Sequence, residues 1–125
     1  MQMLLAIAGG GALGALLRHF LNSFVTHVAG TEFPWGIFAI NVLGSFVMGA
    51  LVSVFAHVWE PPQAMKAFLT VGILGGFTTF STFSLDVVTM IERGDPGAAA
   101  FYIGGSVLLA VAALYGGMVL VRTFS

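Results

Sequence analysis

The most prominent pattern along the chain is a set of four long apolar runs separated by short polar connections. A helix needs about 20 mostly apolar residues to cross the roughly 30 Å hydrocarbon core of a bilayer. The strands of a membrane barrel would alternate apolar and polar positions, and these runs do not. The pattern predicts an all-α integral membrane protein, a single four-helix domain over 1–125 with spans at about 3–25, 33–59, 67–91 and 96–121.

The charge content agrees with this interpretation. The 125 residues include 4 Lys+Arg and 5 Asp+Glu, or 7% charged, whereas a soluble domain carries about 25%. This composition excludes a soluble globular domain, a disordered segment and a nucleic-acid binder that relies on neutralising phosphates. The sequence contains no cysteine, which excludes a disulfide framework or a thiolate metal site.

The basic residues are balanced between the two sides of the expected membrane. Lys66 and Arg122 fall on the side of the N-terminus, whereas Arg93 and Arg18 fall toward the other side. Orientation normally follows an excess of Lys and Arg in cytoplasmic segments. The two-against-two count has two explanations. The protein simply has few charges, or it inserts in both orientations and forms an antiparallel, dual-topology homodimer.

The third run contains a stretch, 72–84, that favours a helix weakly. Gly75 and Gly76 are followed by Thr, Ser and Phe residues, which are poorer helix formers than the flanking residues. The middle of the span falls near Thr79, so we expect the third helix to be broken near the membrane midplane. A break there would present free carbonyls to a cation and free N–H groups to an anion. The alternative is an intact helix whose hydroxyls bond to carbonyls four residues earlier.

Neutral polar residues recur at helical spacing in the apolar runs. Such groups can simply be hydrogen-bonding glue between helices, and aromatic residues at this spacing are often only packing. Together, amide, hydroxyl and positively polarised ring-edge donors suit a small, hard anion that must exchange its hydration shell. A fixed cation would hold such an ion too tightly. The residues are Asn41 and Ser45, Tyr102 and Ser106, and Phe77, Phe80 and Phe83 with Ser81, Thr82 and Ser84 beside them.

Two charged residues lie inside the expected spans, Arg18 in the first and Asp86 in the third. Arg18 is close enough to the end of its span to extend its guanidinium to the interface. Both residues fall at similar depth near the same face, so a structural ion pair between them is a second interpretation. A vestibule in which Arg18 raises the local anion concentration is a third.

Three motifs resemble the signatures of the Fluc (CrcB) fluoride channels of microbes. The first is Gly-Gly-Ala-Leu-Gly-Ala-Leu-Leu-Arg at 10–18, and the second is Asn-Val-Leu-Gly-Ser-Phe at 41–46. The third is Gly-Gly-Phe-Thr-Thr-Phe-Ser-Thr-Phe-Ser at 75–84. The resemblance covers the whole chain, with the motifs in the same order and the same four spans.

The resemblance implies a passive fluoride channel, not an enzyme, in the bacterial inner membrane, built as a dual-topology homodimer with two antiparallel pores in membrane lipid. It implies a central structural sodium ion held by the backbone carbonyls of Gly75 and Thr78. Ala110 stands one turn after Ser106, where a longer hydroxyl track would continue. The pore residues that the resemblance implies are Asn41, Phe80, Phe83, Ser81, Thr82, Tyr102 and Ser106.

Two other classes compete with a channel. A small multidrug-resistance exporter, also a four-helix dual-topology dimer, needs a membrane-embedded carboxylate in its first span, where this chain has only Arg18. A membrane enzyme or a non-transporting anchor subunit is the other class. His19, His27 and His57 show no metal-ligand spacing, and an anchor has no need of the polar stretch at 75–84.

Overall fold

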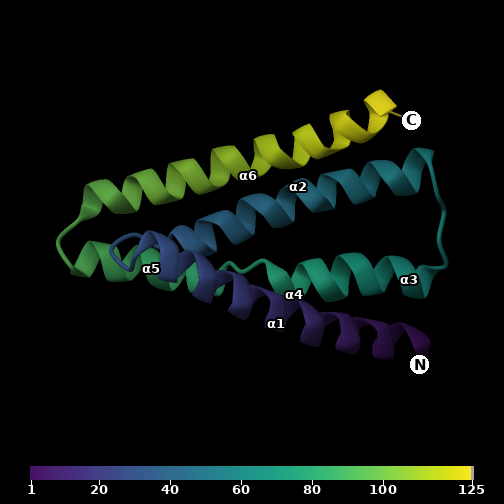
Figure 1. The fold of residues 1–125 in the computed structure, drawn as a ribbon, viewed down its shortest axis with the longest axis horizontal. Coiled ribbons are helices and arrows are strands. Elements are labelled where there is room, and N and C mark those ends of the chain that lie inside the picture. Colours follow the sequence, from purple (N-terminus) through teal and green to yellow (C-terminus); the bar gives the residue numbers. More distant parts are fainter. Residues whose placement is uncertain (125) are drawn as a thin grey trace.

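The computed structural model describes residues 1–124, and helices account for most of them (Figure 1). All four spans are long and apolar enough to cross a membrane, and no strand occurs within residues 1–124. The predicted all-α fold with four membrane-spanning helices is therefore confirmed. The elements are α1 (Gln2–Ala29), α2 (Trp35–His57), α3 (Gln63–Ala67), the π-helix η1 (Phe68–Leu74), α4 (Gly75–Phe77), α5 (Ser81–Glu92) and α6 (Pro96–Phe124).

Glycines end two of the spans at one end of the molecule. α1 runs beyond the expected end of its span and stops at Ala29, where Gly30 takes a φ of 91° and donates its N–H to the Thr26 carbonyl. Gly94, with a φ of 87°, stands two residues after the end of α5 and donates its N–H to the Ile91 carbonyl. Glycine adopts this left-handed conformation at little cost. Both turns lie opposite the end that holds the two chain termini and the α2–α3 connection (Figure 1).

The α2 and α6 helices pack with almost no side-chain volume between them. A methyl group on Gly49 would collide with the Leu114 carbonyl, and one on Gly117 would collide with the Phe46 carbonyl. The buried Ser53 hydroxyl donates to the Met118 carbonyl over 2.9 Å. Small residues allow such close approach between membrane helices, where packing and hydrogen bonds replace the hydrophobic effect.

Apart from α2, which contacts both halves, the two halves of the third span pack against different helices. α3, η1 and α4 contact α1, whereas α5 contacts α6; within residues 1–124, α1 has no packing contact with α5. Glycines line the α1 seam: a methyl on Gly10 would lie 2.9 Å from the Gly72 Cα, and one on Gly76 would lie 2.6 Å from the Gly11 carbonyl oxygen. The third span therefore changes partner midway along its length.

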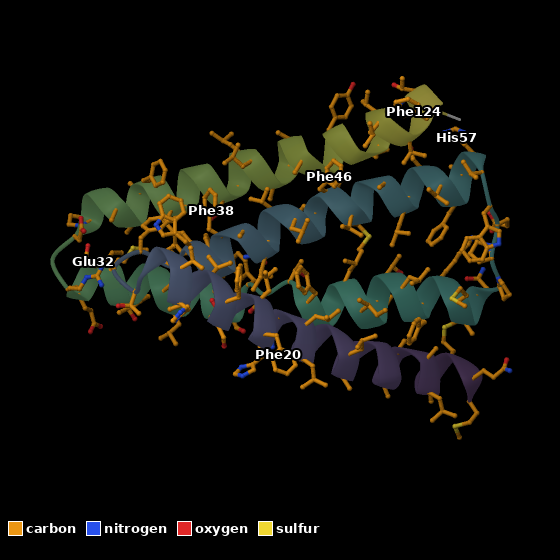
Figure 2. All side chains as sticks on the ribbon, in the orientation of Figure 1. Phe20, Glu32, Phe38, Phe46, His57 and Phe124 are labelled. Atoms are coloured by element: carbon orange, nitrogen blue, oxygen red, sulfur yellow. The ribbon has the colours of Figure 1, made fainter. Side chains whose placement is uncertain are left out.

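The outer faces of the helices are apolar and exposed. Phe20 projects away from the other helices in Figure 2 and is 64% exposed, and Leu108 on α6 is 72% exposed. Only a few side chains, such as Ile40 and Tyr102, are fully buried within the chain. A soluble domain would not expose so many large apolar side chains, and this distribution suits helices surrounded by lipid or by a further copy of the chain.

The adjacent glycines of α6 provide a matched test of the α2–α6 contact. Gly117→Ala should lower stability by about 1–3 kcal/mol, because the added methyl meets the α2 backbone. Gly116→Ala should leave stability unchanged or raise it slightly, since nothing lies within 4 Å of the new methyl and alanine favours a helix. Thermal unfolding of both purified variants in detergent measures the difference. Equal melting temperatures would contradict the described packing.

Candidate functional site

The helix of the third span is interrupted between α4 and α5. α4 ends at Phe77, Thr78 has an extended conformation (φ −80°, ψ 160°), and α5 begins at Ser81. The Asn41 side chain of α2 pairs with the backbone at this point. Its Nδ2 donates to the Thr79 carbonyl (3.0 Å), and the Thr79 N–H donates to its Oδ1 (2.9 Å). One amide side chain therefore replaces two helical backbone partners.

The Gly75 and Thr78 carbonyls are among those that the interruption leaves without the donors of a continuous helix. The Gly75 carbonyl would accept from the Thr79 N–H, but that group donates to Asn41. The Thr78 carbonyl would accept from the Thr82 N–H, but that group donates to the Thr79 hydroxyl (3.2 Å). These are the two carbonyls for which the sequence resemblance implies sodium binding. Free, neutral carbonyl oxygens at a break are suitable ligands for a monovalent cation.

A pocket of about 420 Å³ lies at the interruption. None of its described lining residues carries a charge, and its polar groups are an amide, hydroxyls and backbone. The Ser106 hydroxyl is buried and has no hydrogen-bond partner within residues 1–124, which is uncommon for a buried polar atom. The pocket is lined by Asn41 and Ser45 of α2, Gly75, Thr78, Thr79, Phe80 and Phe83 of the third span, and Ser106, Val107 and Ala110 of α6.

The two phenylalanines at the pocket differ in environment. Phe83 is buried at 7% exposure and lies against Tyr102, with ring centroids 4.8 Å apart. Phe80 is 77% exposed on this single chain, although its ring centroid is only 5.6 Å from that of Phe83. An exposed aromatic ring that also lines a polar pocket is available to a molecule that docks on this face.

The structure brings only part of the expected pore set to the pocket. Asn41, Phe80, Phe83 and Ser106 line it, together with Gly75 and Thr78. Three other expected residues, Ser81, Thr82 and Tyr102, are outside its lining: the Ser81 hydroxyl is 3.5 Å from the Thr79 hydroxyl, and Tyr102 is fully buried behind Phe83.

Thr79 is a residue whose role the sequence did not indicate. Its backbone binds Asn41 and its hydroxyl accepts from the Thr82 N–H, so it organises both ends of the interruption. Its position near the middle of the span was a signal for the break. The spacing between Asn41 and Thr79 carried no signal for the contact, because it depends on how α2 packs against the third span.

The possible ion pair between Arg18 and Asp86 is corrected by the structure. Asp86 accepts a hydrogen bond from the Tyr102 hydroxyl (3.0 Å). Across residues 1–124 the ion pair that forms is Lys66 with Glu60, outside the apolar runs. The reason is the change of packing partner: Asp86 lies on α5, which contacts α6, whereas Arg18 lies on α1, which contacts the first half of the span. The other two interpretations of Arg18, a side chain that extends to the membrane interface and a vestibule charge, stay predictions.

These features define a multi-pass helical membrane protein with an uncharged polar pocket at an interrupted helix. The chain belongs to the CrcB family, because the model of that family, described as CrcB-like protein, Camphor Resistance (CrcB), matches residues 5–118. With bacterial relatives of this kind and four apolar spans, it is a bacterial multi-pass membrane protein.

Curated relatives cover nearly the whole chain. A protein of Rhodospirillum centenum is 52% identical over 123 residues, 98% of each chain. One of Nitrobacter winogradskyi is 50% identical over 119 residues, 95% of this chain and 94% of the relative. One of Rhodopseudomonas palustris is 49% identical over 125 residues, all of both chains. Each is named a fluoride-specific ion channel, FluC, and is thus an ion channel and not an enzyme.

Double-mutant cycles test the partner of Asp86. Tyr102→Phe and Asp86→Ala should be coupled by about 0.5–3 kcal/mol in unfolding free energy, because each removes one partner of the same hydrogen bond. Arg18→Gln and Asp86→Asn should add independently, to within about 0.5 kcal/mol. Thermal or denaturant unfolding in one detergent measures both cycles. Strong coupling of Asp86 to Arg18, with none to Tyr102, would contradict the assigned contact.

Proposed function

We propose that this protein is a passive, fluoride-selective channel that exports cytoplasmic fluoride and relieves its toxicity. The relatives named above support the ion, and the pocket supports the chemistry. The observation that carries the proposal is that an uncharged pocket at a helix interruption offers the Asn41 amide and the unpartnered Ser106 hydroxyl. Both are donors to an anion that sheds water.

The donors of the pocket are suited to a small, hard anion. The Asn41 amide uses one of its two N–H groups on Thr79, which leaves the second as a donor. Edges of aromatic rings such as Phe80 and Phe83 carry partial positive charge. Neutral donors bind fluoride strongly enough to replace hydration and weakly enough to release it. Chloride is larger and forms weaker hydrogen bonds, so it gains less from donors placed this closely.

Fluoride export needs no coupled energy source. Hydrogen fluoride is a neutral weak acid that crosses membranes and ionises in a more alkaline cytoplasm, which traps the anion. A channel lets the anion leave along its electrochemical gradient. No proton-exchanging carboxylate is required of the first span, which distinguishes this mechanism from that of a multidrug exporter.

We further propose that the working unit is an antiparallel homodimer with two pores. The balanced placement of basic residues supports insertion in both orientations. The exposure of Phe80 beside the pocket supports a second chain docking on this face. Because the interruption is close to the middle of Gln63–Glu92, its free carbonyls would meet their own copies across a twofold axis in the membrane plane.

A structural sodium ion is proposed at that central point. The Gly75 and Thr78 carbonyls of two chains would provide four neutral oxygens, a set that suits a monovalent cation, whereas a divalent ion more often recruits carboxylates. Their freedom from helical donors supports the assignment. When bound, the ion supplies positive charge near the pores in a medium of low dielectric.

Fluoride efflux from proteoliposomes tests the proposed function. The purified protein should release fluoride passively, with much slower chloride release under the same gradient. Chloride flux comparable to fluoride flux would rule out a fluoride-selective channel.

Asn41→Asp is the informative variant in this assay. The carboxylate still accepts from the Thr79 N–H but cannot donate, and it repels an anion. Fluoride flux per folded dimer should fall at least about tenfold, the scale of one hydrogen bond to a charged group, beyond any loss of stability from the missing donor to the Thr79 carbonyl. Gln63→Glu on α3 makes the same amide-to-carboxylate change on an exposed side chain outside the pocket and should conduct normally.

The sodium site predicts a cation-dependent stability. At sodium concentrations about 100 times its dissociation constant, bound sodium should stabilise the protein by about 2.7 kcal/mol relative to a bulky organic cation. Thr78→Ser should keep this effect because the ligand is a backbone carbonyl, and Gly75→Val should lose it because a β-branched residue constrains the interruption. Thermal unfolding after prolonged dialysis measures the effect. Indifference of the wild-type protein to sodium would refute the site.

A further inference from the structure

Ser45 is a hydroxyl of the pocket that the proposed pore set does not include. It lies on α2 one turn after Asn41 and lines the same pocket. Within residues 1–124 its hydroxyl forms no hydrogen bond, whereas those of Thr70, Thr78 and Ser84 donate to the carbonyl four residues earlier. Hydroxyls in helices commonly bond in that way, but the Ser45 hydroxyl does not. The Ser45 hydroxyl is therefore available to a ligand in the pocket.

The packing of α2 against α6 sets the level at which Ser45 lies. Both helices run in the same direction (Figure 1). Ser53 donates to the Met118 carbonyl, and one turn earlier Gly49 meets the Leu114 backbone. Parallel helices rise equally with each turn, so this register continues toward the start of both helices.

Continued by one more turn, the register places Ser45 at the level of Ala110, not of Ser106. A further turn brings Asn41 to the level of Ser106. All four residues line the pocket. At the level of Asn41 and Ser106, each helix has a donor, an amide on α2 and a hydroxyl on α6. At the level of Ser45 and Ala110, α6 offers only a methyl group, and the polar group comes from α2.

We propose that Ser45 is an ion-contacting residue of the pore and that it supplies, from α2, the donor that α6 lacks at Ala110. The inference rests on the proposed function and adds a residue that determines its rate and selectivity. The ligand is a small monovalent anion that accepts an O–H hydrogen bond. A hydroxyl at this level lets the anion leave Asn41 and Ser106 without losing all its donors at once, since its next partner lies one turn away.

Fluoride and chloride efflux from proteoliposomes that contain equal amounts of dimer provides the test. Ser45→Ala should slow fluoride efflux about tenfold, the loss expected when one hydrogen bond to a charged group is removed. Ser45→Thr keeps the hydroxyl and should conduct fluoride well. Adding Ala110→Ser to Ser45→Ala moves the hydroxyl to the facing helix at the same level and should restore much of the rate.

Ser23→Ala is the control, because it removes a serine hydroxyl from an exposed position of α1 outside the pocket and away from the α2–α6 contact. It should leave the flux per dimer unchanged. A Ser45→Ala rate equal to that of the wild type would overturn the inference and leave the proposed function intact. Loss of flux in Ser45→Thr as well as Ser45→Ala would also overturn it, since packing and not the hydroxyl would then be responsible. A wild-type protein that does not conduct fluoride would overturn both proposals.

Discussion

The pairing of Asn41 with the Thr79 backbone is the interaction on which the rest of the structure depends. An interrupted helix in a hydrocarbon environment exposes N–H and C=O groups that water cannot reach, and each costs several kcal/mol if it stays unpaired. Asn41 satisfies one donor and one acceptor of the same residue, and the Thr79 hydroxyl accepts from the Thr82 N–H. Helical partners are still missing for the Gly75 and Thr78 carbonyls and, on the donor side, for the Phe80 and Ser81 N–H groups. The interruption therefore presents both free carbonyls and free N–H groups inside the apolar span.

The same interruption allows the third span to serve two neighbours. Its first half lies in a glycine-lined seam with α1, and its second half packs against α6. A straight helix would keep one face and one direction along its whole length. The π-helical segment η1 precedes the interruption and widens the helical turn, which changes the face that later residues present. The pocket forms where the two halves diverge, with α2 and α6 closing its other walls.

The sequence predicts the four spans well, because the length of an apolar run depends on local composition. Contacts between residues far apart in the sequence are not predictable in this way, because they depend on how the helices pack. Arg18 and Asp86 match in depth and charge, yet depth says nothing about which helices touch, and Asp86 faces Tyr102 instead. Likewise, Asn41 is recognisable as a polar residue in a span, but its bond to Thr79 depends on Gly44, where a methyl would collide with the Thr78 side chain.

The absence of charge among the described lining residues of the pocket connects the fold to its chemistry. Burying a Lys or Arg at this depth would cost several kcal/mol, and an anion bound to it would be slow to leave. Neutral donors avoid both penalties, but each is weak, so several must be held in place together. The close α2–α6 contact at Gly49 and Gly117 provides that rigidity, because it fixes the level of every α2 donor relative to α6. Packing that looks purely structural, well away from the pocket, thereby determines whether successive donors are near enough for an ion to pass between them.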